Sequence, residues 1–161
     1  MICFEIPISE LNLLFFQKNR RSLLDFSEIN STIKQVSGIN DFFNSQEQAT
    51  ELLEKIEEHD TIVSEPDRRE YGDFQTNQVL AHKITEYVYT QCAEFEFLLE
   101  PTCGKGSFLL ASIKQFKKLK KIVGVDIYQP YVWETKFRIL EYFLSSERNS
   151  KPEVNIIHAN V

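Results

Sequence analysis

Apolar residues recur at the three- to four-residue spacing of an amphipathic helix in three early stretches of the chain, over residues 10–36, 45–58 and 77–90. The second of these is the clearest helix, and all three are separated by polar residues. The apolar positions of the first stretch are Leu11, Leu14, Phe15, Leu23 and Leu24. We expect the second helix to carry Ala49, Leu52, Leu53 and Ile56 on one face, and the third to turn Leu80, Ile84, Tyr87 and Val88 inward.

The pattern then changes to short apolar runs separated by helical segments. Residues 95–99, 121–125 and 154–158 have the length and composition of buried strands, and residues 107–116 and 130–144 are typical of helices between them. This alternation is the order of a parallel crossover series. We therefore predict an α/β fold, with an open, incomplete Rossmann-like sheet of about three parallel strands behind an α-helical N-terminal segment.

The charged residues are also distributed differently in the helical and the α/β parts of the chain. Residues 1–70 hold 7 Lys or Arg against 14 Asp or Glu, whereas residues 71–161 hold 11 against 10. Between the helical and the α/β parts, the polar stretch 64–73 contains proline and glycine and predicts a linker. We therefore predict a helical segment over residues 1–66 and a second domain over residues 67–161. The net charge of −6 does not indicate a stand-alone nucleic-acid binder.

Composition indicates a soluble protein of the cytoplasm. No apolar run approaches the roughly 20 residues that a membrane span needs. The N-terminal apolar residues carry Glu5 and Glu10 and no basic leader, which disfavours a secretory signal. Cys3, Cys92 and Cys103 form no Cys-x-x-Cys pair, so the sequence predicts neither a zinc site nor a disulfide framework.

Candidate chemistry gathers at the turn after residues 95–99, which reads "EPTCGKGSFL". Gly104 and Gly106 would let a ligand approach the backbone at the start of a helix. The order of residues does not fit a triphosphate-binding loop, and Leu109 stands where a dinucleotide fingerprint has its third glycine. The carboxylate of Glu100 disfavours a pyrophosphate beside it. It favours a cationic ligand such as S-adenosylmethionine, which carries an ammonium and a sulfonium group.

Asp126 ends the second predicted strand, 20 residues after Gly106. A carboxylate at this place accepts hydrogen bonds from ribose hydroxyls, whether the ligand is NAD or S-adenosylmethionine. Ile127 and Tyr128 follow it and could sandwich an adenine ring. Asp126 therefore predicts a nucleoside and does not choose between the two ligands.

These segments resemble the DNA adenine-N6 methyltransferases of restriction-modification systems. "EPTCGKGSFL" resembles their motif I, residues 71–84 ("YGDFQTNQVLAHKI") look like their motif X, and residues 123–127 ("VGVDI") are similar to their motif II. The sequence "IIHANV" resembles the approach to motif III, with Asn160 where the family usually has Asp. The resemblance implies a Rossmann-like methyltransferase fold, S-adenosyl-L-methionine as cofactor and DNA as the partner of the complete enzyme.

The same resemblance implies roles for individual residues. Glu100 would meet the amino group of the cofactor, the glycine turn would contact it through the backbone, and Asp126 would bind the ribose. The residues that the resemblance assigns to the cofactor are Phe74, Gln75, Thr76, Asn77, Glu100, Pro101, Thr102, Cys103, Gly104, Gly106, Phe108, Asp126, Ile127 and Asn160.

The family's catalytic motif, Asn/Asp/Ser-Pro-Pro-aromatic, orients the adenine amino group and stacks on the flipped base. No Pro-Pro pair occurs in the 161 residues, so we name no catalytic residue and expect the isolated chain not to methylate DNA. Two alternatives stay open: a methyltransferase acting on RNA, protein or a small molecule, and a non-catalytic fragment that binds cofactor or a partner chain. Cys103 is interpreted as a packing residue, because the nucleophile of cytosine-C5 methyltransferases directly follows a proline.

The strand at residues 95–99 is expected to be an open edge of the sheet, flanked by Phe95, Phe97 and Leu98. Unpaired N–H and C=O groups beside apolar side chains form an association site. We expect self-association or a partner chain at this edge, unless residues 1–66 cover it.

Overall fold

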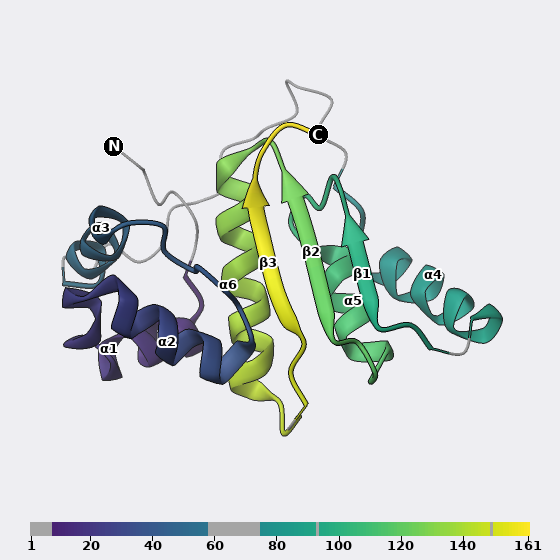
Figure 1. Ribbon diagram of the computed structural model, residues 1–161, viewed down its shortest axis with the longest axis horizontal. Helices are drawn as coiled ribbons and strands as arrows, with labels where there is room; N and C mark the ends of the chain where they lie inside the picture. Colours follow the sequence, from purple (N-terminus) through teal and green to yellow (C-terminus); the bar gives the residue numbers. More distant parts are fainter. Residues whose placement is uncertain (1–7, 58–74, 93, 149) are drawn as a thin grey trace.

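A computed structural model describes residues 8–57, 75–92, 94–148 and 150–161. The elements in chain order are α1 (Glu10–Lys18), the 3-10 helix η1 (Ser22–Leu24), α2 (Phe26–Ser37), α3 (Gln46–Glu57), α4 (Gln78–Gln91), β1 (Phe97–Glu100), α5 (Ser107–Gln115), β2 (Lys121–Asp126), α6 (Gln129–Ser145) and β3 (Glu153–His158) (Figure 1). The predicted α/β class, with helices first and alternating strands and helices after them, is confirmed. The predicted linker lies outside the described residues.

The three strands form one parallel sheet in the order β1-β2-β3, with Leu98 opposite Ile122 and Ile122 opposite Val154. Both crossover helices, α5 and α6, lie on the same face of this sheet (Figure 1). That face is buried, as the full burial of Ile122 and Val154 indicates. Because parallel strands are joined through these helices, their carboxyl ends meet at one edge of the sheet, next to the first turn of α5.

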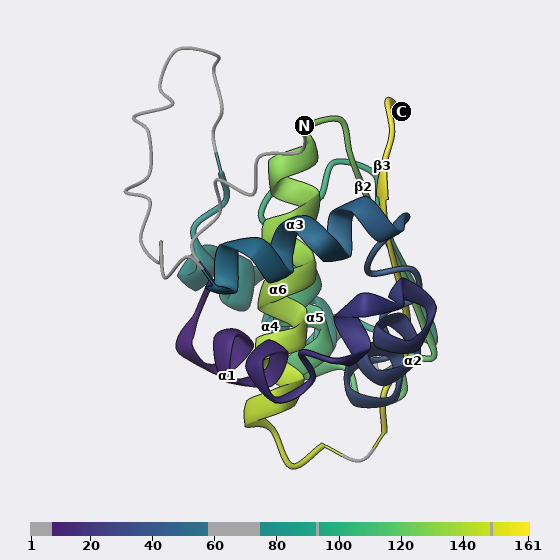
Figure 2. The same ribbon diagram turned by 90° about the vertical axis from the view of Figure 1, so that its left-hand side faces the viewer.

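The described N-terminal helices pack beside α6 and β3 (Figure 2). Ile39 forms a parallel bridge with Val154, and the backbone N–H of Asn40 donates to the carbonyl of Val154 at 2.8 Å. Asn12 donates from Nδ2 to the carbonyl of Phe137 on α6 at 3.0 Å. The described part of the segment therefore lies against α6 and the β3 edge, on the far side of the sheet from β1.

An aromatic cluster joins the N-terminal segment to α6. Phe42 is fully buried, and its ring centroid lies 5.3 Å from that of Phe137 and 5.7 Å from that of Trp133. Phe16 and Phe43 pack against the same rings. Residues from both predicted domains therefore share one hydrophobic core, while the boundary placed between residues 66 and 67 stays a prediction.

Lys136 is buried within this junction. Its Nζ donates to the carbonyls of Asp41 and Phe42 at 2.8 and 2.9 Å, and it lies 4.9 Å from the ring centroid of Trp133. Burial lowers the pKa of Lys136 to about 8, against a smaller raising effect of Asp41. The lysine thus satisfies two carbonyls of the loop between α2 and α3, since an unpaired buried carbonyl would be costly.

Helix α4 exposes most of the face that the sequence pattern predicted to be buried, although Val88 packs partly buried against the core. Leu80, Ile84 and Tyr87 are exposed, whereas the small residues Ala81 and Thr85 are buried. The reason is that α4 packs against α5, which covers only the narrow stripe of small residues. The predicted apolar positions Leu11, Leu14 and Leu24 are exposed as well.

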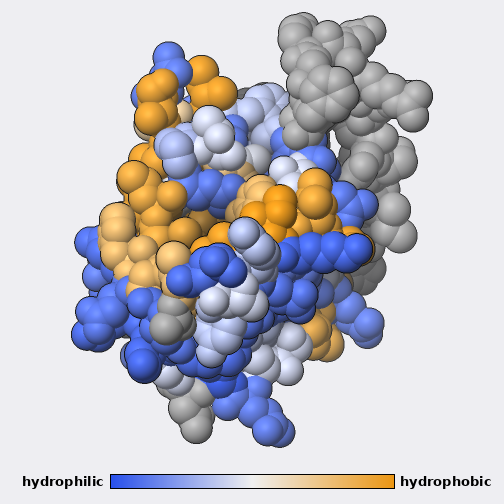
Figure 3. All heavy atoms as spheres, turned by 90° about the vertical axis from the view of Figure 1, so that its right-hand side faces the viewer, coloured by the Kyte–Doolittle hydropathy of each residue, from blue (hydrophilic) through white to orange (hydrophobic). Residues whose placement is uncertain are grey.

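Strand β1 is an edge of the sheet among the described residues. Phe97 and Leu99 are each about half exposed, at 53% and 54%. Figure 3 faces this side of the molecule and shows orange apolar surface among hydrophilic surface. The edge position of β1 agrees with the sequence, and association at it stays a prediction. No helix within the described ranges is long and apolar enough to cross a membrane.

Candidate functional site

The turn between β1 and α5 requires its two glycines. Gly104 and Gly106 have φ of +50° and +75°, in the left-handed region that favours glycine. A Cβ on Gly104 would lie 2.4 Å from Oε1 of Gln75, and one on Gly106 would lie 2.7 Å from Cγ2 of Thr135. The backbone of the turn is therefore enclosed on two sides, by the residues before α4 and by α6.

Asp126, at the end of β2, holds this turn directly. Its Oδ2 accepts a hydrogen bond from the backbone N–H of Gly104 at 2.7 Å, and its Oδ1 accepts one from the backbone N–H of Tyr128 at 2.8 Å. The carbonyl of Asp126 also accepts from the N–H of Ala159, next to Asn160. The ends of all three strands therefore converge on Asp126, as the parallel topology predicts.

Glu100 lies at the end of β1, at the first turn of α5. Burial raises the pKa of Glu100 to about 7, a hydrogen bond from the backbone N–H of Leu109 opposes the shift, and the negative charge of Asp126 adds to it. Its Oε2 is buried and meets no donor in the part of the chain that the structure describes. A buried acceptor without a donor is costly unless a ligand supplies one.

Cys103 packs beneath the turn. The residue is only 4% exposed, and its backbone N–H donates to the carbonyl of Val125 at 2.8 Å. Burial raises the pKa of the Cys103 thiol to about 12, and the charges of Asp126 and Glu100 add to the effect. The thiol is therefore protonated at neutral pH, which makes it a poor nucleophile.

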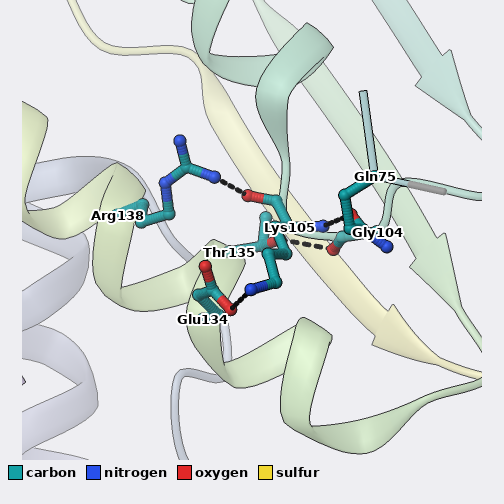
Figure 4. Close-up of polar contacts among 6 residues, drawn as sticks. All are labelled: Gln75, Gly104, Lys105, Glu134, Thr135 and Arg138. Atoms are coloured by element: carbon teal, nitrogen blue, oxygen red, sulfur yellow. Dashed lines mark hydrogen bonds and ion pairs between the residues drawn. The ribbon is translucent and has the colours of Figure 1, made fainter. Parts of the chain in front are cut away.

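Three residues of α6 contact the turn, and the sequence motifs did not point to them. Thr135 donates from Oγ1 to the carbonyl of Gly104 at 2.9 Å, Arg138 donates from Nη1 to the carbonyl of Lys105, and Glu134 forms an ion pair with Nζ of Lys105 at 3.4 Å (Figure 4). These residues lie about 30 positions beyond the turn, outside any motif, so only their shared helical face could have indicated them.

The segment resembling motif X reaches the same turn through Gln75, whose Oε1 accepts from the backbone N–H of Lys105 at 2.9 Å (Figure 4). Asn77 is the N-cap of α4 and accepts from the N–H of Val79. Thr76 is half-buried, and Phe74 lies outside the described residues. Among the described residues of this segment, Gln75 thus contacts the glycine turn.

The remaining predicted residues surround the turn at different depths. Ile127 and Tyr128 are exposed, so their side chains are accessible beside Asp126. Pro101, Thr102 and Asn160 are exposed, and Phe108 is half-buried at the start of α5. No group of three or more His, Cys, Asp or Glu with the arrangement of a metal site occurs among the residues that the structure describes.

Comparison with known proteins relates the chain to part of longer enzymes. No family model matches it. It is 37% identical to the type II methyltransferase M.NspV of Nostoc sp. over 84 residues, which are 52% of this chain and 17% of that protein. It is 29% identical to the type II methyltransferase M.VspI of Vibrio sp. over 111 residues, which are 69% of this chain and 26% of that protein.

A modification subunit of a putative type I restriction enzyme from Vibrio vulnificus is structurally similar, with a TM-score of 0.42 and 18% identity over 73% of this chain and 25% of that one. The chain spans about a sixth to a quarter of the length of the curated relatives it matches. It is related over that part to DNA methyltransferases of restriction-modification systems.

Proposed function

We propose that this chain supplies the S-adenosylmethionine-binding part of a DNA methyltransferase that acts on the N6 amino group of adenine. The partial identity to two type II methyltransferases supports the class of enzyme. The resemblance of residues 100–109 to motif I of the adenine-N6 enzymes supports the finer assignment. When bound, the cofactor would supply the methyl group.

The observation that carries the proposal is the buried Oε2 of Glu100, which has no donor among the described residues. A ligand ammonium would donate to it and offset the cost of burying the carboxylate. Asp126 lies on the adjacent strand and would accept from the ribose. A pyrophosphate would bring further negative charge to a place where two carboxylates already interact unfavourably.

We assign cofactor binding to residues of this chain. We do not assign methyl transfer to DNA to this chain alone. The 161 residues contain no Pro-Pro pair. Methylation of adenine needs groups that orient the amino nitrogen and hold the flipped base, and proximity of the cofactor does not replace them.

The proposal predicts selective binding by the purified chain. Isothermal titration with S-adenosylhomocysteine, the demethylated cofactor, should give saturable binding, because this molecule keeps the ammonium and the ribose. NAD titrated under the same conditions is the matched control and should not bind. Binding of NAD without binding of S-adenosylhomocysteine would contradict the proposed class.

Cofactor affinity should also increase with pH between about 5 and 7. The pKa of Glu100 is raised to about 7, so its carboxyl is largely neutral at pH 5, and a neutral carboxyl binds an ammonium poorly. If only the carboxylate binds, affinity changes by up to about tenfold per pH unit below that pKa and levels off above it.

Glu100→Gln tests the assignment, because this variant cannot ionise at residue 100. Its affinity for S-adenosylhomocysteine should be low at every pH, and the slope between pH 5 and 7 should disappear. A variant that keeps the slope of the original protein would show that another group causes it. Because the pKa of Glu100 is raised on folding, the ligand-free protein should lose stability over the same rise in pH.

A further inference from the structure

We propose that Thr135 and Arg138 of α6 are positioning residues, which hold the glycine turn in the shape that binds the cofactor. This inference rests on the proposed function, and it concerns residues that no motif of the sequence includes. Neither side chain needs to touch the cofactor for this role, since both act through the backbone carbonyls of the turn.

Thr135 is the more deeply buried of the two residues. It is fully buried, yet it is polar, and its hydroxyl donates to the carbonyl of Gly104 at 2.9 Å. The N–H of the same glycine donates to Oδ2 of Asp126 at 2.7 Å. Gly104 is thus fixed through both of its polar backbone groups. Its N–H bonds to Asp126 of β2, and its carbonyl bonds to Thr135 of α6 (Figure 4).

Arg138 follows Thr135 by three residues and therefore lies on the same face of α6. It donates to the carbonyl of Lys105, the next residue of the turn. Lys105 in turn donates from its backbone N–H to Gln75 at 2.9 Å. Helix α6 therefore binds the carbonyls of Gly104 and Lys105. The N–H groups of the same two residues bond to Asp126 and Gln75.

These hydrogen bonds matter because the backbone of glycine can adopt more conformations than that of any other residue. A turn with Gly104 and Gly106 in the left-handed region could adopt many other conformations if its peptide groups were free. A ligand that binds one conformation must order the turn, and that cost lowers affinity. The hydrogen bonds from α6 order the turn in the free protein, so ligand binding no longer has to supply this ordering free energy.

The test compares Thr135→Val with Thr135→Ser. Valine has nearly the shape of threonine but no hydroxyl, so the carbonyl of Gly104 loses its buried donor. We expect Thr135→Val to bind S-adenosylhomocysteine roughly two- to tenfold more weakly, with Thr135→Ser much closer to the original protein. Arg138→Met should weaken binding in the same direction.

Two further measurements separate positioning from general stability. Thr85→Val is the matched control, because Thr85 is also buried and donates to Ala81 within α4. It should lower the melting temperature without changing affinity at a temperature where the protein is folded. Hydrogen–deuterium exchange without ligand should be faster at residues 103–107 in Thr135→Val than in the original protein or in Thr135→Ser.

Unchanged affinity in folded Thr135→Val would overturn the inference, and so would unchanged exchange at the turn. If the original protein binds no S-adenosylhomocysteine, the proposed function fails. The exchange experiment then still decides whether α6 holds the turn.

Discussion

Replacing Phe42 with alanine should lower the free energy of unfolding by about 3–5 kcal/mol, which is the usual cost of removing a fully buried phenylalanine. Phe42 is fully buried and packs edge-on against Trp133 and Phe137 of α6. The substitution would leave a cavity between the N-terminal segment and α6. Urea unfolding followed by circular dichroism measures the change.

Phe97→Ala is the matched control, since it removes the same side chain from β1, where Phe97 is 53% exposed. Its loss should cost far less than that of Phe42. The expected difference depends on one cooperative unfolding transition that includes both parts of the chain. Two separate transitions, of which only the first shifts in Phe42→Ala, would mean that the N-terminal segment unfolds independently of the sheet.

The elements of this fold were predictable because their signals are local. Short apolar runs bounded by turn residues marked β1, β2 and β3, and the spacing of apolar residues marked α3, where Ala49, Leu52 and Ile56 are buried as predicted. The stretch predicted to be helical, residues 10–36, consists of two α-helices separated by η1. Apolar spacing alone does not reveal such a break, because the pattern resumes on its far side.

The buried face of a helix is less predictable than the helix itself. In α4 the sequence pattern favoured the large residues Leu80 and Ile84, and the structure buries Ala81 and Thr85 instead. Which face is buried depends on the neighbouring element, and close approach of two helices requires small side chains. Periodicity therefore identified α4, while its packing against α5 selected the face.

The candidate site was predictable where it depends on strand ends and glycines. Asp126 lies 22 residues beyond Gly104 in the sequence but reaches the turn after Glu100, because parallel strands bring their carboxyl ends together. Thr135 and Arg138 were not predictable, since a polar residue in a helix has many ordinary roles. Their contacts with the turn arise from the packing of α6 on β2 and β3, which is a tertiary property.

Asp126→Ala should weaken binding of S-adenosylhomocysteine by roughly tenfold to a hundredfold, the range expected from losing one charge-assisted hydrogen bond. Two effects act in the same direction. The proposed bonds to the ribose disappear, and the N–H groups of Gly104 and Tyr128 lose the carboxylate that now accepts from them at 2.7 and 2.8 Å. Titration calorimetry at a temperature where both proteins are folded measures the loss.

Glu96→Ala is the matched control for removing a negative charge, because Glu96 is exposed, pairs with Lys120 and precedes β1 at the opposite end of the sheet. Its affinity for S-adenosylhomocysteine should equal that of the original protein. A comparison with Asp126→Asn isolates the charge, since the amide keeps one oxygen that can accept from an N–H group. If Asp126→Ala binds as tightly as Glu96→Ala, the cofactor does not lie at the ends of β1 and β2, and the contacts of Asp126 serve only to close the turn.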